Sequence, residues 1–164
     1  MDLKQCWNHY LKAEQLLEQG HWPEAQYLYD LVLSNMPTHI QESANNSATK
    51  PCQFVCLVTG YRDAAVSQSQ ILNKMGQYQA AFDCLNHAHA LLQFLSIEQN
   101  DLVRATEHLI TKASDDLLRH IGAFCSSQRN ASWMFEFELL QKAQHYFDTL
   151  KCSQQTLTRT HVMN

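Results

Sequence analysis

Glycine and proline are scarce in this sequence of 164 residues, which contains four and three of them. A sheet protein needs turn residues at short intervals, and few stretches here alternate strictly between apolar and polar residues. Apolar residues instead recur every three or four positions along most of the chain, which is the spacing of one helix face. Composition and periodicity therefore predict an all-α fold.

Concentrated positive charge is also missing. The 12 Lys and Arg residues are scattered without a run of three, and the formal net charge is −4. A duplex-binding surface needs clustered basic residues, so we expect no nucleic-acid partner. No apolar run approaches the roughly 20 residues that span a bilayer, and the first ten residues lack the pattern of a secretory signal. We therefore expect a cytoplasmic protein without a membrane partner.

Signatures of catalysis are absent as well. The sequence contains neither a glycine-rich phosphate loop nor a Gly-x-Ser-x-Gly motif. Two carboxylate pairs occur, Asp115 with Asp116 and Glu136 with Glu138. Neighbouring residues diverge on a helix, so neither pair is placed to share a proton. The sequence thus predicts that the protein is not an enzyme.

The sequence contains six cysteines: Cys6, Cys52, Cys56, Cys84, Cys125 and Cys152. A chain of this length can form its own core, so we expect free, buried thiols rather than disulfides. Cys52 and Cys56 lie four residues apart, and Cys84 and His87 lie three apart, which leaves a metal or redox sensor as a minor alternative. The established zinc-site spacings do not occur, and we predict no metal or cofactor.

A pattern of residues occurs twice. The segments LLEQGHWPEAQYLYDLVLSNMP (16–37) and ILNKMGQYQAAFDCLNHAHALL (71–92) align on Gly20 and Gly76. In both, a leucine precedes the glycine by four residues, an aromatic residue follows it by two, and an alanine follows it by five. Glycine closes a helix in the left-handed conformation, and alanine allows close helix packing. Each segment therefore predicts a helical hairpin, and Pro37 is expected to end the first one.

This spacing resembles that of the tetratricopeptide repeat (TPR). The matching positions are Gly20, Ala25, Tyr29, Val32, Leu33 and Pro37 in the first copy, and Gly76, Ala81, Leu85 and Ala88 in the second. The match covers the turn and second helix of each hairpin. The two glycines lie 56 residues apart, whereas the family repeats about every 34 residues. We assign the excess to a longer helix and to a polar surface loop over 38–50.

The remaining segments complete the predicted architecture. The run 54–58 could form a strand, but apolar residues continue from it in steps of four and three through Gly60, which favours a helix. A third hairpin is expected over about 99–151, after hairpins over about 2–36 and 52–94. The resemblance implies antiparallel hairpins stacked as a short TPR-like solenoid of about six helices. We expect one domain over 1–152 and a disordered tail over 153–164.

In the TPR family, the first helix of each repeat lines a concave groove that holds a peptide or helix of a partner. The resemblance places these residues in the groove: Trp7, Tyr10, Glu14, Leu17, Val66, Gln70, Asn73 and Lys74. Trp7, Tyr10 and Leu17 could equally serve as core residues. Some family members grip a carboxylate with a Lys and Asn clamp. Tyr10 and Glu14 occupy the matching positions of the first repeat, so an apolar or basic segment suits this groove better.

The function expected from the sequence is that of an adaptor or scaffold that binds a peptide or helix of another protein. One alternative is a chaperone similar to those of bacterial secretion systems, which hold a client segment in the groove. A Cys/His metal or redox sensor is a further, weaker alternative. A second copy of the chain could also cover the groove, which would make the protein a homodimer.

Overall fold

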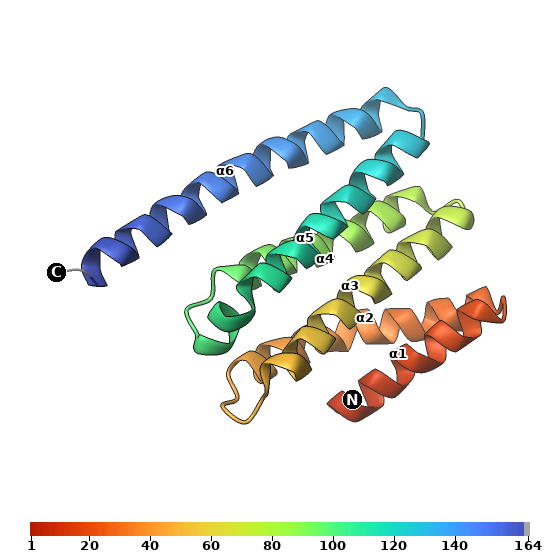
Figure 1. Cartoon of the computed structure of the whole chain (residues 1–164). Helices are drawn as coiled ribbons and strands as arrows, with labels where there is room; N and C mark the ends of the chain where they lie inside the picture. Colours follow the sequence, from red (N-terminus) through yellow and green to blue (C-terminus); the bar gives the residue numbers. More distant parts are fainter. Residues whose placement is uncertain (163–164) are drawn as a thin grey trace. The chain divides into compact units, whose positions relative to one another are not determined.

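The computed structural model describes residues 1–162, with side chains as far as residue 157. It contains six helices and, over the described residues, no strand (Figure 1). The helices are α1 (Leu3–Glu18), α2 (Trp22–Ala44), α3 (Pro51–Lys74), α4 (Tyr78–Ser96), α5 (Asp101–Ser127) and α6 (Ala131–Val162). The prediction of an all-α fold with about six helices is confirmed. Between residues 1 and 162, no helix is both long and apolar enough to cross a bilayer.

The chain divides into two compact units, Met1–His120 and Ile121–Asn164. The division falls inside α5, so one continuous helix contributes residues to both units. The sequence predicts one domain over 1–152, whereas the contacts of the structure group into these two units. Unit 1 contains α1 to α4 and most of α5, and unit 2 contains the end of α5 and all of α6.

In unit 1, helices that follow one another in sequence also pack against one another. α1 packs on α2, α2 on α3, and α3 on α4, with each helix antiparallel to the one before it (Figure 1). The largest fully buried apolar side chains of this unit are Tyr29, Met36, Ile40, Phe54, Ile71, Leu85, Leu92, Leu95, Ile110 and Leu117. Burial of each such side chain contributes roughly 1.5–3 kcal/mol, so this core is the main source of stability in unit 1.

Gly20 and Gly76 form the turns of the two hairpins in the same way. Their φ angles are 79° and 78°, a left-handed conformation that glycine adopts without steric cost. In both turns, the residue after the glycine donates its N–H to the carbonyl of the leucine four residues before the glycine, at 2.9 Å. This is the hydrogen-bond pattern of a Schellman helix end. The two predicted turns are therefore present and have the same geometry.

The residues that follow these turns are also equivalent. Ala25 and Ala81 are fully inaccessible to solvent, as expected for small residues where two helices approach closely. Tyr29 and Leu85, which align four residues further on, are likewise buried. The internal repeat read from the sequence thus corresponds to two hairpins with matching buried positions.

Gly60 lies inside α3, and the segment 54–58 is helical rather than a strand. A Cβ atom added at Gly60 would lie 2.8 Å from Cζ3 of the Trp7 ring. Real side chains do not approach so closely, so glycine is what allows α1 and α3 to meet at this point. Its cost in an α-helix, up to about 1 kcal/mol, is offset by the contact with the Trp7 ring.

Pro37 does not end the second helix, contrary to the sequence-based prediction. α2 continues through it to Ala44. Met36, Ile40 and Ala44 continue the buried face of the helix on both sides of the proline. A proline inside a helix costs about 3 kcal/mol, and burial of these apolar side chains outweighs that cost. The polar loop is consequently shorter than the predicted 38–50 and begins at residue 45.

In unit 2, α6 extends beyond residue 151, where the third hairpin was expected to end. Residues 153–162 of the predicted disordered tail continue α6, and 163–164 lie outside the described residues. The sequence of α6 contains neither glycine nor proline, so nothing in it interrupts the helix. Within this unit, Phe124 contacts Trp133 edge to face, with ring centroids 5.3 Å apart. A Cβ atom added at Gly122 would lie 2.7 Å from the Phe137 ring.

Candidate functional site

The predicted groove residues of α1 lie together with charged residues of α3. We define the aromatic face by Trp7, Tyr10, Glu14, Arg62 and Asp63. The Trp7 and Tyr10 rings contact each other with centroids 5.1 Å apart, and both side chains remain partly exposed. Their spacing of three residues places them on one side of α1, and Gly60 of α3 admits the Trp7 ring.

Two carboxylates lie within electrostatic reach of the Tyr10 hydroxyl. Burial, together with the negative charges of Glu14 and Asp63, raises the pKa of Tyr10 to about 12, while Arg62 acts in the opposite direction. Glu14 also accepts a hydrogen bond from the buried Tyr29 hydroxyl. Tyr10 therefore stays protonated and can donate a hydrogen bond at any physiological pH.

Arg62 holds the aromatic face to α5 within unit 1. Its Nε donates to Asp63 Oδ1 and its Nη1 donates to Asp116 Oδ2, each at 3.0 Å. Arg119 also pairs with Asp116. Arg62 and Asp63 were not among the residues predicted from the sequence. Their nearness to Gly60 in the chain is the signal that could have found them, because the glycine marks where α3 meets α1.

The other predicted groove residues are less closely associated. Those that keep part of their surface accessible are Leu17, Val66, Gln70 and Asn73. The Lys74 ammonium lies 4.4 Å from the centroid of the Trp22 ring, at the start of α2. This distance is typical of a cation–π contact, so Lys74 is engaged near the hairpin turns and not beside Tyr10. The structure thus brings Trp7, Tyr10 and Glu14 together, whereas Lys74 contacts Trp22 instead.

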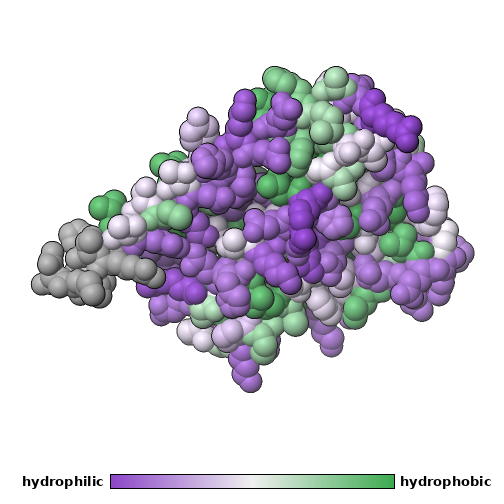
Figure 2. All heavy atoms as spheres, turned by 45° about the horizontal axis from the view of Figure 1, so that its top comes forward, coloured by the Kyte–Doolittle hydropathy of each residue, from purple (hydrophilic) through white to green (hydrophobic). Residues whose placement is uncertain are grey.

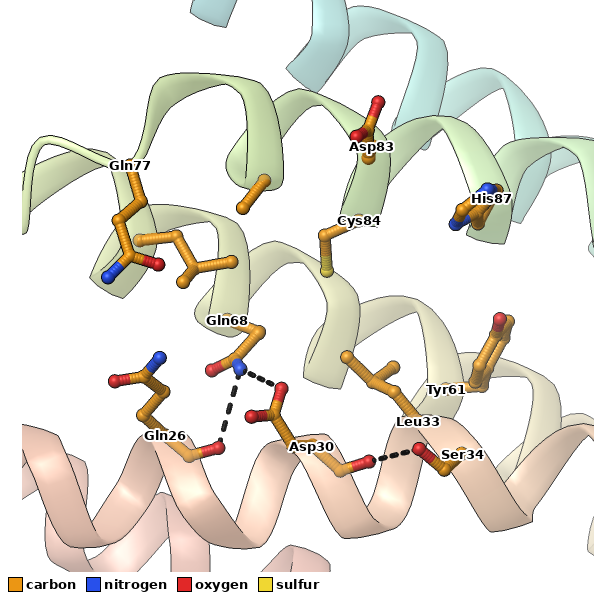
Figure 3. A pocket seen from close by; sticks show the side chains of 12 residues that line it. Gln26, Asp30, Leu33, Ser34, Tyr61, Gln68, Gln77, Asp83, Cys84 and His87 are labelled. Carbon is orange, nitrogen blue, oxygen red and sulfur yellow. Dashed lines mark hydrogen bonds between the residues drawn. The ribbon is translucent and has the colours of Figure 1, made fainter.

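A pocket of unit 1 lies between α2, α3 and α4, and we call it the Gln68 pocket (Figure 3). Its volume is about 500 Å³. Tyr61, Gln68 and Leu72 of α3 line it, at spacings of seven and four residues that place them on one helix face. Gly60 and Asp63 lie on a different face of α3, so the pocket and the aromatic face are separate features.

Gln68 lies at the floor of this pocket and connects α3 to α2. Its Nε2 donates to Asp30 Oδ1 at 2.5 Å and to the backbone oxygen of Gln26 at 3.3 Å. The side chain is 1% exposed, and its Oε1 has no hydrogen-bond partner among the described residues. The sequence gave no indication of the pocket.

The chain has no match among protein-family models, curated proteins or solved structures. No residue role can therefore be transferred from a relative. The function of the aromatic face and of the Gln68 pocket is inferred from the residues that form them.

The cysteines are all free, but they are not all buried. Cys6 and Cys125 are buried, whereas Cys52, Cys56 and Cys152 are exposed. Burial raises the pKa of Cys6 and of Cys125, which keeps both as unreactive thiols. The expectation of free thiols agrees with the structure, and the expectation of burial fails for the three exposed residues.

Cys84 lines the Gln68 pocket. Its Sγ donates to the backbone oxygen of Ala65 at 3.5 Å. Burial and, to a smaller extent, the nearby Asp30 carboxylate raise the pKa of Cys84 to about 12. A thiol in such surroundings is neither a nucleophile nor a metal ligand at neutral pH. Over residues 1–162, no three His, Cys, Asp or Glu side chains are grouped as a metal site requires.

Proposed function

We propose that the protein is an adaptor that binds a peptide or helix of another protein at the aromatic face. The observation that carries this proposal is the contact between Trp7 and Tyr10, two partly exposed aromatic side chains with Arg62 within electrostatic reach. Trp, Tyr and Arg are the residue types that most often dominate binding energy at protein interfaces. Partial burial holds the rings in place, so binding would cost little side-chain entropy.

The charges around the rings indicate the chemistry of the partner. Glu14 and Asp63 lie close to Tyr10, and Arg62 is already paired with Asp63 and Asp116. An apolar segment with a basic residue would place its side chain against the rings and its positive charge beside Glu14. An acidic segment would be repelled by the same carboxylate.

The proposal extends to the architecture and the compartment. Two hairpins with identical glycine turns support a TPR-like arrangement of unit 1, in which α1 and α3 present the binding face. The six free thiols support a cytoplasmic location, because a reducing compartment keeps cysteines in this state.

Affinity capture from the native host with three variants tests the proposal. The bait proteins are the wild type, Tyr10→Ala and Tyr27→Ala, and circular dichroism checks that each is folded. Tyr27 is an exposed tyrosine on α2, outside the aromatic face, and serves as the matched control. We expect the wild type and Tyr27→Ala to capture the same protein and Tyr10→Ala to lose at least about tenfold of it, as for removal of an interface hot spot.

Two results would contradict the proposal. Capture of the same proteins in equal amounts by all three baits would exclude the aromatic face as the binding surface. Failure of the wild type to capture any protein reproducibly would exclude the adaptor function itself. If a partner is captured, its binding peptide is identified next. We expect that peptide to be apolar with at least one basic residue.

A further inference from the structure

The Gln68 pocket contains one buried hydrogen-bond acceptor that the protein does not use. The Gln68 amide has its nitrogen toward Asp30, because the reverse orientation would place its oxygen against a carboxylate (Figure 3). The amide oxygen therefore lies on the other side, buried and without a partner among the described residues. A buried carbonyl oxygen without a hydrogen bond costs about 1–3 kcal/mol, so a donor placed there would be favoured.

Negative charge in the pocket is also uncompensated. Asp30 forms no ion pair within the described part of the chain, and neither Lys nor Arg is among the residues that line the pocket. Asp83 lines it too, but its Oδ1 accepts from Gln79 and Figure 3 shows its carboxylate directed away from Gln68. The negative charge beside Gln68 is thus that of Asp30, which is an exposed residue.

Apolar side chains form much of the remaining wall. Leu33 of α2, Leu72 of α3 and Ala80 of α4 all line the pocket. A ligand that fits this combination needs an aliphatic stem, a positive charge, and several hydrogen-bond donors without an acceptor. Arginine has all of these, because its planar guanidinium carries five N–H donors at the end of three methylene groups.

We propose that the Gln68 pocket binds an arginine side chain of a partner protein. The guanidinium donates to the unpaired oxygen of Gln68 and to Asp30, and the methylene groups lie against Leu33 and Leu72. The source of the arginine rests on the proposed adaptor function, whereas the pocket itself does not. The pocket lies between α2 and α4, away from the aromatic face, so the two sites would contact different parts of a partner.

Other ligand classes fit the pocket less well. A phosphate or carboxylate would be repelled by Asp30 and would offer no donor to the Gln68 oxygen. A metal ion would find no cluster of three ligands among residues 1–162. A lysine ammonium has the right charge, but its donors radiate from one point and do not match two acceptors on two helices as a planar fork does.

The test uses N-acetyl-arginine amide as the probe and the full chain as the protein, followed by NMR of the side-chain amide of Gln68. The neutral isostere N-acetyl-citrulline amide is the control ligand. We expect the arginine derivative to shift the Gln68 amide signals in a saturable manner, with a dissociation constant of about 1–10 mM, as is usual for so small a ligand. Citrulline should bind at least about tenfold more weakly because it lacks the charge.

Asp30→Asn and Asp83→Asn form a matched pair of variants. Each removes one negative charge from the lining of the pocket, and the amide oxygen that Asp30→Asn introduces can still accept the hydrogen bond from Gln68. We expect Asp30→Asn to weaken arginine binding about tenfold and Asp83→Asn to change it less than about twofold. Gln68→Met, which retains the size of the side chain without its oxygen, should also weaken binding.

Three results would overturn the proposal. Equal responses to arginine and citrulline would show that the charge is not recognised. Equal losses in Asp30→Asn and Asp83→Asn would show a general electrostatic effect instead of a site. The absence of any saturable shift at Gln68 would show that the pocket does not bind arginine. Because the probe is a small molecule, these results do not depend on whether a partner binds the aromatic face.

Discussion

α4 of unit 1 and α6 of unit 2 differ in how much of their apolar surface is buried. α4 of unit 1 buries eight of its residues, including Leu85 and Leu92. α6 of unit 2 buries none between residues 131 and 157, and Tyr146 and Leu150 are 70% and 67% exposed. Both segments have helical periodicity in their sequences. Periodicity therefore predicts that a helix forms, but it does not predict that its apolar face finds a partner.

The two helices also differ in their small residues. α4 follows a glycine turn and has Ala81 and Ala88 on its buried face, which allows α3 to approach. α6 follows a turn at Arg129, whose φ is 50°, and has no equivalent pair of buried alanines over its described side chains. Figure 2 shows one face of the molecule, on which hydrophobic side chains are interspersed among hydrophilic ones.

Leucine truncations in these two helices should have the largest difference in effect. Leu85 is 1% exposed and Leu150 is 67% exposed. We expect Leu85→Ala to lower the free energy of unfolding by about 2–5 kcal/mol, because it leaves a cavity in the core. Leu150→Ala should change it by less than about 0.5 kcal/mol. Urea denaturation followed by circular dichroism measures both, and equal effects would contradict the comparison.

Substitution of Gly60 and of Gly122 by alanine should differ less in its effect on the free energy of unfolding. A Cβ at Gly60 would meet Trp7 and approach Tyr10, two rings that also contact each other, whereas at Gly122 it would meet the Phe137 ring alone. We expect Gly60→Ala to destabilise by about 1–2 kcal/mol, as overpacking exceeds the gain in helix propensity. Gly122→Ala should be nearly neutral, because Phe137 is partly exposed and can rotate away.

Urea denaturation of both variants tests this prediction. If Gly60→Ala is neutral or stabilising, the Trp7 ring can move without cost, and the aromatic face is not held in place as we describe. Near-ultraviolet circular dichroism of the variant would show such a movement directly, because the signal of a tryptophan depends on its contacts.

Substitution of either turn glycine by alanine should lower the free energy of unfolding by the same amount. Gly20 and Gly76 have φ angles that differ by one degree, and no atom lies within 4 Å of a Cβ built at either. The cost of Gly20→Ala and of Gly76→Ala is therefore conformational, at about 1–2 kcal/mol each. Thermal unfolding measures both. A difference larger than about 1 kcal/mol would show that the two turns are not equivalent in energy.

The thiols of α4 and α6 allow a comparison without any substitution. The pKa of Cys84 is raised to about 12, whereas Cys152 of α6 is exposed. At pH 8, Cys84 has about a thousandfold less thiolate than a thiol of pKa near 9, and its thiolate increases tenfold per pH unit. We expect Ellman's reagent to modify Cys152 rapidly and Cys84 slowly. Mass spectrometry identifies the modified residues, and rapid reaction of Cys84 would contradict its burial.

Local features of this fold could be predicted from the sequence. The neighbouring residues indicate the turns at Gly20 and Gly76 and the helical state of 54–58. The contact between Trp7 and Tyr10 follows as well, because residues three apart share a helix face. These predictions needed no knowledge of which helices are neighbours.

Features that depend on the packing of distant helices could not be predicted. Asp30 and Gln68 are 38 residues apart, and Arg62 and Asp116 are 54 apart. Their pairing depends on the choice of neighbouring helices, which periodicity does not determine. The continuation of α2 through Pro37 was missed for a similar reason, because tertiary burial of Ile40 and Ala44 outweighs a local preference that the sequence does show.

Pro37 has a consequence for how the wall of the Gln68 pocket moves. A proline has no N–H, so the carbonyl of Leu33 cannot receive its usual helix hydrogen bond. One turn earlier, the Ser34 hydroxyl donates to the carbonyl of Asp30, a contact that tends to bend helices. Leu33 and Asp30 both line the pocket. Because one bond is missing from the backbone ladder at Leu33, α2 can bend at this point, and such a bend would shift the wall of the pocket without loss of the hairpin.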